Sequence, residues 1–290
     1  MRYNTPAAFR QALEERLRQR ARETGEPLVR MRKRIVFERC MARLQKTPDN
    51  PWVVKGGFAL ELRLGMQARM TKDLDLGVDL GYFGGQIHTA TDVALKLRQD
   101  LGESMEDGLT FQVPSRGEHA LPIPGVQAYR FTVEARLDGR EFETMTVDIG
   151  IGDPLIPPFD ELNGSDLLSF ADIPVVTIRA TSRAQHFAEK VHALTRPFDD
   201  RVNTRVKDLA DIMLLMNLGL SDPSAVMAAV TEVFDARKSH DIPQTIQNAP
   251  STWGNSFAAM AKELSLAETT LDQATARLNH YWSKLFSKSE

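Results

Sequence analysis

The chain contains a single cysteine among its 290 residues. Cys40 has no second cysteine to pair with, so a secreted scaffold held together by intramolecular disulfides is excluded. Apolar residues never continue for the roughly 18 positions that a membrane-spanning helix needs. The first twenty residues also lack the apolar stretch of roughly 7–15 residues that signal peptides carry. We therefore expect a cytoplasmic protein with no membrane partner.

A large excess of charge of either sign is also lacking, because 36 Lys and Arg stand against 39 Asp and Glu, a net charge of -3. This total predicts no overall attraction to nucleic acid. The distribution is uneven, since residues 1–46 hold 13 basic and 5 acidic side chains. A basic head thus precedes an acidic body. With 42% apolar and 26% charged residues, collagen-like and disordered classes are excluded.

The first fifty residues predict a pair of helices. Thr5-Pro6 is typical of a helix start, and apolar residues then recur every four positions up to Gly25. A second helix is expected from about Pro27 to the loop before Pro48. The basic residues of this head are either a solvated helix face or a surface that binds phosphates. The candidates for RNA binding are Arg20, Arg32, Lys33 and Arg34.

The rest of the chain predicts an α+β core followed by a helical domain, with boundaries at 51–181 and 182–290. Short apolar runs separated by glycines suggest strands at 52–54 and 74–78, with helices at 58–64 and 89–101. Two strands around Asp138-Gly139 predict a long hairpin, and an edge strand is expected at 175–178. Helical periodicity then predicts helices near 182–195, 205–218, 223–237 and 255–286.

Two carboxylates in the core point to a metal. Asp73 and Asp75 are two apart on a predicted strand, so both side chains leave the same face. Oxygen ligands of this kind suit Mg²⁺ that also holds substrate phosphates. The glycine pair Gly56-Gly57 follows the preceding strand and lets backbone N–H groups approach an anion. Taken alone, Asp-x-Asp is more often a surface turn or a salt-bridged strand end.

A third carboxylate comes from the hairpin. Val147 and Ile149 are apolar, so Asp148 projects from the opposite face of its strand together with Thr146. If this strand lies beside the Asp73–Asp75 strand, three carboxylates could hold two metal ions, which is chemistry for nucleotidyl transfer.

A second cluster is predicted in the helical domain. Lys190 lies at the border of an apolar helical stripe, and Asp208 and Asp211 share one face of the next helix. Asp211 lies among apolar residues, where a lone carboxylate is costly. Lys190 and Asp211 therefore either tie two helices together or handle a nucleotide, with the lysine on the triphosphate and an aspartate positioning it or accepting a proton.

Four motifs in order resemble one family: KGGFALELRLG from residue 55, RMTKDLDL from 69, EKVHAL from 189 and RVKDLAD from 205. Over about 52–215 the chain is similar to the AbiEii/AbiGii nucleotidyltransferase-like toxins, including the mycobacterial MenT group. The resemblance implies a polymerase-β-like nucleotidyltransferase core and a cognate antitoxin. It also implies Mg²⁺-dependent transfer of nucleotides, in several members pyrimidines, from an NTP to the 3′ end of tRNA, which blocks aminoacylation and translation.

The resemblance also implies roles for residues. Gly56 and Gly57 would face the triphosphate, and Asp73 and Asp75 would hold Mg²⁺. Lys190 would bind phosphate. Asp211 would complete the site, and Asp208 is a further candidate.

The chain departs from the broader pattern at Phe58, where a Ser or Thr often binds phosphate. Arg69 and Lys72, or backbone amides, would have to compensate. Asp148 as a metal ligand rests on the strand geometry alone. The basic head would guide the tRNA acceptor stem.

The same residues are also compatible with other functions. The same fold could transfer a nucleotide to a protein or small-molecule hydroxyl, act as a phosphotransferase, or serve as a non-catalytic interaction protein.

Overall fold

The computed structural model describes residues 2–79, 89–114, 119–121, 127–197, 205–220, 222–247 and 249–287. The chain forms two compact units. Unit 1 comprises Met1–Met66, Met70–Leu155 and Asp160–Ala180, and unit 2 comprises Gln67–Arg69, Ile156–Phe159 and Thr181–Glu290. Within the described ranges, no helix is both long and apolar enough to cross a membrane.

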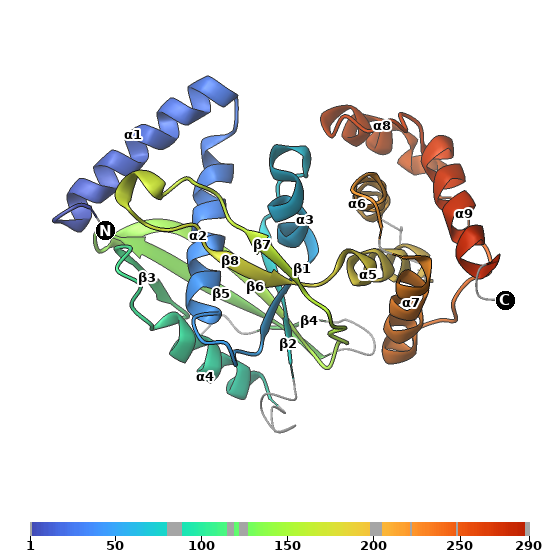
Figure 1. The fold of residues 1–290 in the computed structure, drawn as a ribbon, viewed down its shortest axis with the longest axis horizontal. Helices are drawn as coiled ribbons and strands as arrows, with labels where there is room; N and C mark the ends of the chain where they lie inside the picture. The colour runs from blue at the N-terminus through green and yellow to red at the C-terminus, as the bar shows by residue number, and fades with distance from the viewer. Residues whose placement is uncertain are drawn as a thin grey trace. The chain divides into compact units, whose positions relative to one another are not determined.

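Unit 1 is built on a mixed sheet, which agrees with the predicted α+β class (Figure 1). Its strands run in the order β3-β5-β6-β2-β1-β8-β7, with β4 paired to β5. The strands are β1 (Trp52–Lys55), β2 (Asp73–Val78), β3 (Leu109–Gln112), β4 (His119–Leu121), β5 (Gln127–Leu137), β6 (Arg140–Ile151), β7 (Asp160–Asn163) and β8 (Thr177–Ala180). Strand β2 is parallel to β6 and antiparallel to β1.

The β5–β6 hairpin turns where the sequence predicts it. Asp138 and Gly139 have φ of 57° and 66°, the left-handed pair that a tight hairpin turn requires. The register then shifts between Ala135 and Arg136, so that Phe142 is an extra residue on β6. This bulge brings the apolar side chains of both strands onto one face.

The part of unit 1 that the structure describes also contains the α-helices α1 (Pro6–Thr24), α2 (Leu28–Leu44), α3 (Gly56–Leu64) and α4 (Ala90–Leu101). Thr5 caps α1 by accepting from the Ala8 backbone N–H, as its sequence predicts. Helix α2 lies across the sheet in contact with β6 and β8, and α4 packs beside it (Figure 1). Phe9 and Leu13 of α1 share one buried cluster with sheet residues such as Phe131. The basic head therefore belongs to the same compact unit as the sheet.

The edge position expected for the strand near 175–178 is wrong. The strand β8 lies inside the sheet, parallel to β1 on one side and antiparallel to β7 on the other. The sequence of β7, Asp-Glu-Leu-Asn, is polar at three of four positions, so its apolar content does not reveal a strand.

Unit 2 is helical: α5 (Arg183–Thr195), α6 (Val206–Asn217), α7 (Pro223–Arg237), α8 (Gly254–Glu263) and α9 (Leu271–Ser287). The single helix expected over 255–286 is wrong, because the chain breaks between α8 and α9. Ser265 takes a left-handed conformation there, with φ of 53°, which no α-helix continues through. The core includes Phe187, Met213, Val230 and Trp282.

Candidate active site

Strand β2 presents two carboxylates on one face of the sheet. Leu74 and Leu76 are buried in the core, whereas Asp73 and Asp75 are half-buried on the opposite face. This alternation is the one expected from the sequence, since successive strand residues point to opposite faces. The two carboxylates thus share a surface of unit 1.

Strand β6 lies beside β2 and adds the third carboxylate to this face. Asp148 is the Cα partner of Asp75 in the parallel pairing. Its neighbours Val147 and Ile149 are fully buried on the other face. The structure therefore places the three aspartates that the sequence singled out on one face of the sheet, although their role as metal ligands stays a prediction.

The carboxylates belong to a row of charges that crosses four strands. Lys55 on β1 is opposite Asp75, Asp75 is opposite Asp148, and Asp148 is opposite Arg130 on β5. Two adjacent negative residues are thus flanked by a positive residue on each side. Cross-strand pairs of opposite charge are stabilising and like charges are not, so the two outer cations offset repulsion between the inner carboxylates.

Arg130 holds Asp148 through a two-pronged ion pair. Its Nε and Nη2 donate to the two Asp148 oxygens at 2.8 and 2.7 Å. The hydrogen bond to Asp148 raises the pKa of Arg130 against the effect of burial, and the charges of Asp73 and Asp75 act in the same direction. The guanidinium is therefore in the electrostatic reach of all three carboxylates.

A divalent cation fits the chemistry of these donors. Carboxylate oxygens are the ligands that Mg²⁺ takes, and the cluster already attracts a cationic side chain. Among the residues that the structure describes, however, no three acidic, His or Cys groups converge closely enough to enclose a metal. Asp73 and Asp75 would hold the ion, while Asp148 is engaged by Arg130.

The start of α3 lies against Asp75. Gly56 has φ of 59°, and a Cβ on it would lie 2.0 Å from Asp75 Oδ2. The carboxylate thus occupies the space that any side chain at this position would need, next to the positive end of the helix. Gly57 is buried beside it. That the pair faces a triphosphate stays a prediction.

A further ion pair at the end of β1 was not anticipated from the sequence. Lys55 Nζ lies 2.5 Å from Asp153 Oδ2, and both side chains are only 8% exposed. The Lys55 stem passes 3.1 Å from where Gly77 would carry a Cβ. A Cβ at Gly77 would lie closer still to Leu155 Cδ2, at 2.6 Å, so this glycine leaves room for both the leucine and the lysine stem.

Unit 2 contains the second cluster that the sequence predicts. Lys190 Nζ lies 2.8 Å from Asp208 Oδ1 and 2.8 Å from Asp211 Oδ2. Both aspartates are on α6 and the lysine is on α5, so the tie between neighbouring helices is present. It includes Asp208 as directly as Asp211.

Arg69 completes this cluster rather than standing alone. Its Nε and Nη2 donate to the two oxygens of Asp211 at 2.9 and 2.8 Å. Arg205 adds a longer contact to Asp208 at 3.4 Å. Lys72, by contrast, is exposed. The sequence does not pair Arg69 with Asp211, because the two lie 142 residues apart. Arg205 lies only three residues before Asp208, so the helical i, i+3 spacing was a signal that could have found this pair.

The cluster holds charged groups in a buried place. Burial alone would raise the pKa of Asp211, but Lys190 and Arg69 outweigh it and lower the pKa to about 2. Burial likewise works to lower the pKa of Lys190, whereas Asp208 and Asp211 raise it above its ordinary value. Asp211 and Lys190 therefore both stay ionised near neutral pH.

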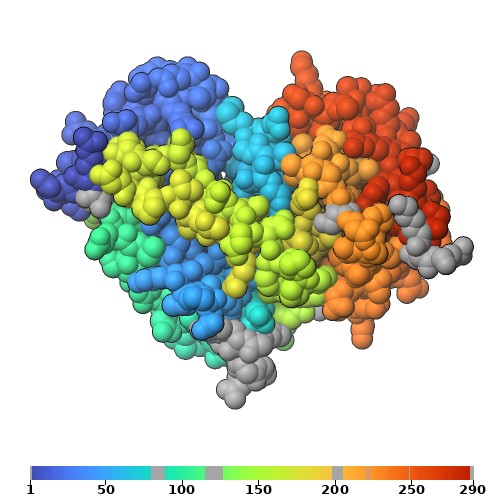
Figure 2. All heavy atoms as spheres, in the orientation of Figure 1, coloured from blue at the N-terminus to red at the C-terminus, as the bar shows by residue number. Residues whose placement is uncertain are grey.

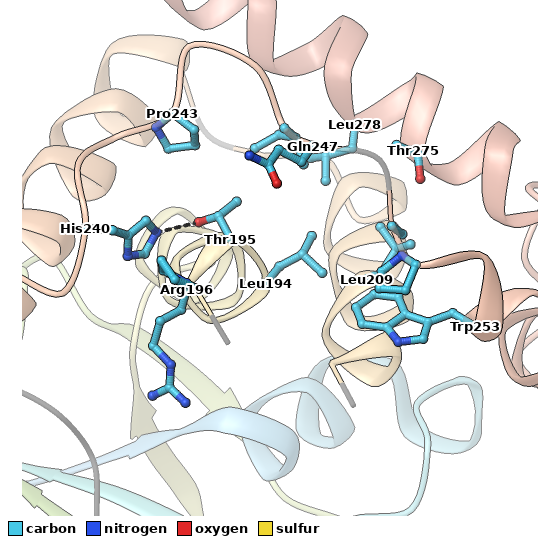
Figure 3. A pocket seen from close by; sticks show the side chains of 14 residues that line it. Leu194, Thr195, Arg196, Leu209, His240, Pro243, Gln247, Trp253, Thr275 and Leu278 are labelled. Atoms are coloured by element: carbon cyan, nitrogen blue, oxygen red, sulfur yellow. Dashed lines mark hydrogen bonds between the residues drawn. The ribbon is translucent and has the colours of Figure 1, made fainter. Parts of the chain in front are cut away.

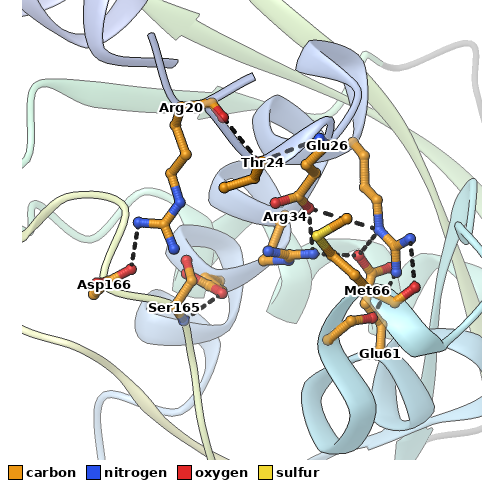
Figure 4. Close-up of polar contacts among 11 residues, drawn as sticks. Arg20, Thr24, Glu26, Arg34, Glu61, Met66, Ser165 and Asp166 are labelled. Atoms are coloured by element: carbon orange, nitrogen blue, oxygen red, sulfur yellow. Dashed lines mark hydrogen bonds and ion pairs between the residues drawn. The ribbon is translucent and has the colours of Figure 1, made fainter. Parts of the chain in front are cut away.

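The four RNA-binding candidates of the basic head all form ion pairs with acidic residues, some in the head and others elsewhere in unit 1. Arg20 contacts Asp166 at 2.9 Å, and Arg34 contacts Glu26 and Glu61 (Figure 4). Arg32 pairs with Glu14, and Lys33 with Glu143. The side chains of Arg34 and Lys33 are only 11% and 16% exposed, against 42% for Arg20 and 30% for Arg32.

Helix α1 and the segment carrying Asp166 lie side by side at the surface of unit 1 (Figure 2). Of the four RNA-binding candidates, Arg20 and Arg32 are thus the better placed to meet a partner.

Unit 2 also has a cavity of about 600 Å³, within the range of small-molecule pockets. His240 and Thr195 line it and are joined by a 2.8 Å hydrogen bond (Figure 3). Most of the remaining lining is apolar, including Leu194, Leu209 and Trp253. None of the described lining residues is acidic or a lysine, so the described lining offers no carboxylate to a metal and includes none of Lys190, Asp208 and Asp211.

The comparison with protein families decides the assignment. The model of the family described as "Nucleotidyl transferase AbiEii toxin, Type IV TA system" matches residues 39–287. The chain belongs to this family. Membership confirms the resemblance drawn from the four motifs and makes this AbiEii-family protein a nucleotidyltransferase toxin of the toxin–antitoxin class. Membership in the family implies an NTP substrate and an antitoxin partner, and usually a divalent metal.

Among the solved structures that are similar to this AbiEii-family chain, two illustrate the likeness. One is MenT4, a nucleotidyltransferase toxin from Mycobacterium tuberculosis H37Rv, at 18% identity and a TM-score of 0.49, covering 88% of this chain and 91% of that one. The other, from H. pylori and assigned as a nucleotidyltransferase, has 15% identity and a TM-score of 0.44, covering 88% and 96%. No curated protein matches the chain.

Proposed function

We propose that this enzyme uses Mg²⁺ to transfer nucleotides, preferentially pyrimidines, from an NTP to the 3′ end of tRNA, and that this transfer blocks aminoacylation and translation. The observation that carries the proposal is the placement of Asp73 and Asp75 side by side on one strand face, with Asp148 in register beside them. Family membership supplies the reaction class.

In this proposal Asp73 and Asp75 hold the metal. Bound there, Mg²⁺ would polarise the attacking hydroxyl and neutralise charge on the phosphates. Asp75 is fixed by its packing against Gly56, and a fixed carboxylate orients the ion with little reorganisation. The backbone at the start of α3 offers N–H groups that suit an anion.

The Lys190 cluster is proposed to bind the triphosphate. Lys190, Arg69 and Arg205 bring three positive charges against two negative ones on Asp208 and Asp211. The surplus charge favours an anion. Asp211 is fully buried, so we assign it to holding Lys190 and Arg69 in place. Lys72, which is exposed, is proposed to add a further charge toward the nucleotide.

The acceptor is proposed to be the tRNA acceptor stem, guided by the basic head. Arg20 and Arg32 are the most exposed of the four candidates, and phosphate contacts would exchange their present carboxylate partners for the RNA backbone. Lys33 and Arg34 would not contact the RNA directly, but would add positive charge beneath the surface that Arg20 and Arg32 form.

Labelled NTPs test this function directly. Each of the four NTPs is incubated with the protein and Mg²⁺ in the presence of total tRNA, a protein lysate or a set of small-molecule alcohols. We expect label from CTP or UTP on tRNA, and its loss in Asp73→Asn. Glu134→Gln is the matched control, because this carboxylate lies on the same sheet face, four residues from Arg130 along β5. If label appeared only on protein or on small molecules, the acceptor would be that class of molecule and not tRNA. Full activity of a folded Asp73→Asn variant would exclude the metal assignment.

A further inference from the structure

Arg130 lies on the same sheet face as Asp73, Asp75 and Asp148, directly beside Asp148. We propose that Arg130 is an internal counter-cation, which competes with the divalent metal for Asp148 and thereby couples metal binding to nucleotide binding. This inference rests on the proposed function. Arg130 acts through Asp148 and the metal, and is therefore a positioning residue.

The geometry places Arg130 where a cation is needed. Strand pairing sets Arg130 opposite Asp148 and Asp148 opposite Asp75. The guanidinium binds both oxygens of Asp148 at 2.8 and 2.7 Å. Two-pronged arginine–carboxylate pairs are the strong and directional kind. With both of its oxygens in this pair, Asp148 has to exchange the guanidinium for a metal before it can act as a ligand.

The exposure of the pair allows this exchange. The Arg130 side chain is 43% exposed, so its guanidinium can rotate into solvent without opening the core, and Asp148 is 17% exposed. Lys55, at the other end of the charge row, differs because it is 8% exposed and is bound to the equally buried Asp153. The row therefore has one fixed cation and one that can leave.

The charges of the three aspartates favour replacement of the Arg130 guanidinium by a divalent metal. Asp73, Asp75 and Asp148 on one face repel one another, and Arg130 offsets part of that repulsion in the absence of metal. A divalent ion would supply twice the charge and remove the need for the guanidinium. Once released, Arg130 would be attracted by the phosphates that accompany the ion. Metal and triphosphate would then each favour binding of the other, as linkage requires.

The test measures metal affinity rather than turnover. Mn²⁺ is titrated into wild type and Arg130→Gln by calorimetry, with and without a non-hydrolysable NTP analogue. We expect Arg130→Gln to bind Mn²⁺ about tenfold more tightly without nucleotide, and the tightening caused by the analogue to shrink by a similar factor. Arg130→Lys should lie between the two proteins, since a lysine keeps the charge but not the two-pronged contact.

Arg136→Gln is the matched control. It removes an arginine from the same face of β5, and its nearest carboxylate is Glu134, at 3.9 Å. Its Mn²⁺ affinity should equal that of wild type. Unchanged or weaker Mn²⁺ binding by Arg130→Gln would overturn the inference and identify the ion pair as purely structural. If Asp73→Asn instead bound Mn²⁺ as wild type does, the metal assignment of the proposed function would fail.

Discussion

Asp75 occupies the space that a side chain at Gly56 would need, since a Cβ built on Gly56 lies only 2.0 Å from Asp75 Oδ2. The contact joins the first residue of α3 to a strand residue 19 positions further along the chain. It explains why the first glycine of the pair has to lack a side chain: the carboxylate and the helix start share one small volume. The position of the carboxylate thus depends on Gly56.

Gly56→Ala should therefore damage the site beyond its cost in backbone strain. Positive φ costs a residue with a Cβ about 1–2 kcal/mol, and displacement of a carboxylate by about 1 Å can cost on the order of 100-fold in rate. We therefore expect nucleotide incorporation to fall on the order of 100-fold. Gly139→Ala is the control, because its φ of 66° imposes similar strain with nothing within 4 Å. Equal activity in the two folded variants would show that the contact does not matter.

Acid should weaken unit 2 through Asp211. Its pKa is lowered to about 2 by Lys190 and Arg69, despite burial, whereas the unfolded chain titrates near 4. The unfolded state therefore takes up the proton first, so this stabilisation is complete above about pH 5 and is lost as the pH falls toward 2. Between pH 6 and pH 3, urea unfolding should show wild type losing about 1 kcal/mol more than Asp211→Asn. An equal loss in both proteins would contradict this assignment.

A buried acidic residue in unit 1 should be more important for stability than an exposed one with an equally short contact. Asp107 is 1% exposed and lies 2.7 Å from both Arg39 and Arg43. Asp107→Asn leaves these two guanidinium groups without their counter-charge, and we expect a cost of about 3–5 kcal/mol. Glu103 also lies 2.7 Å from a cation, Lys46, but half of its side chain is exposed.

The matched variant Glu103→Gln should leave the denaturation midpoint unchanged, because exposed pairs contribute little. Similar midpoints for the two variants would mean that burial of Asp107 does not set its importance.

Salt dependence tests the basic head as an RNA surface. If Arg20 and Arg32 contact phosphates, the double variant Arg20→Gln/Arg32→Gln should bind tRNA with a shallower dependence on salt. The slope of log K against log salt should fall in magnitude by about 0.7–0.9 for each lost contact. Lys262→Gln, an exposed residue of α8, serves as the control. A slope that stays at the wild-type value would remove the head from the RNA surface.

The sequence alone could have predicted the bulge that positions Arg130. Apolar residues occupy odd positions on both strands of the hairpin, such as Phe131 and Val147. A regular pairing outward from the two-residue turn would set odd positions opposite even ones. One inserted residue corrects this mismatch, and the corrected register sets Arg130 opposite Asp148. The signal in the sequence is that apolar residues fall on odd-numbered positions in both strands.

Local pattern by itself determined the placement of Asp73 and Asp75 on one face, the hairpin turn at Asp138-Gly139, the helix cap at Thr5 and the family motifs. Each depends on residues within a few positions of one another, where backbone periodicity decides the outcome. Only the tertiary structure decided which charges meet. Arg69 is 142 residues from Asp211, and Lys55 is 98 from Asp153. Such pairs follow from strand order and helix packing, because many arginines and carboxylates along the chain would satisfy the same charge rule.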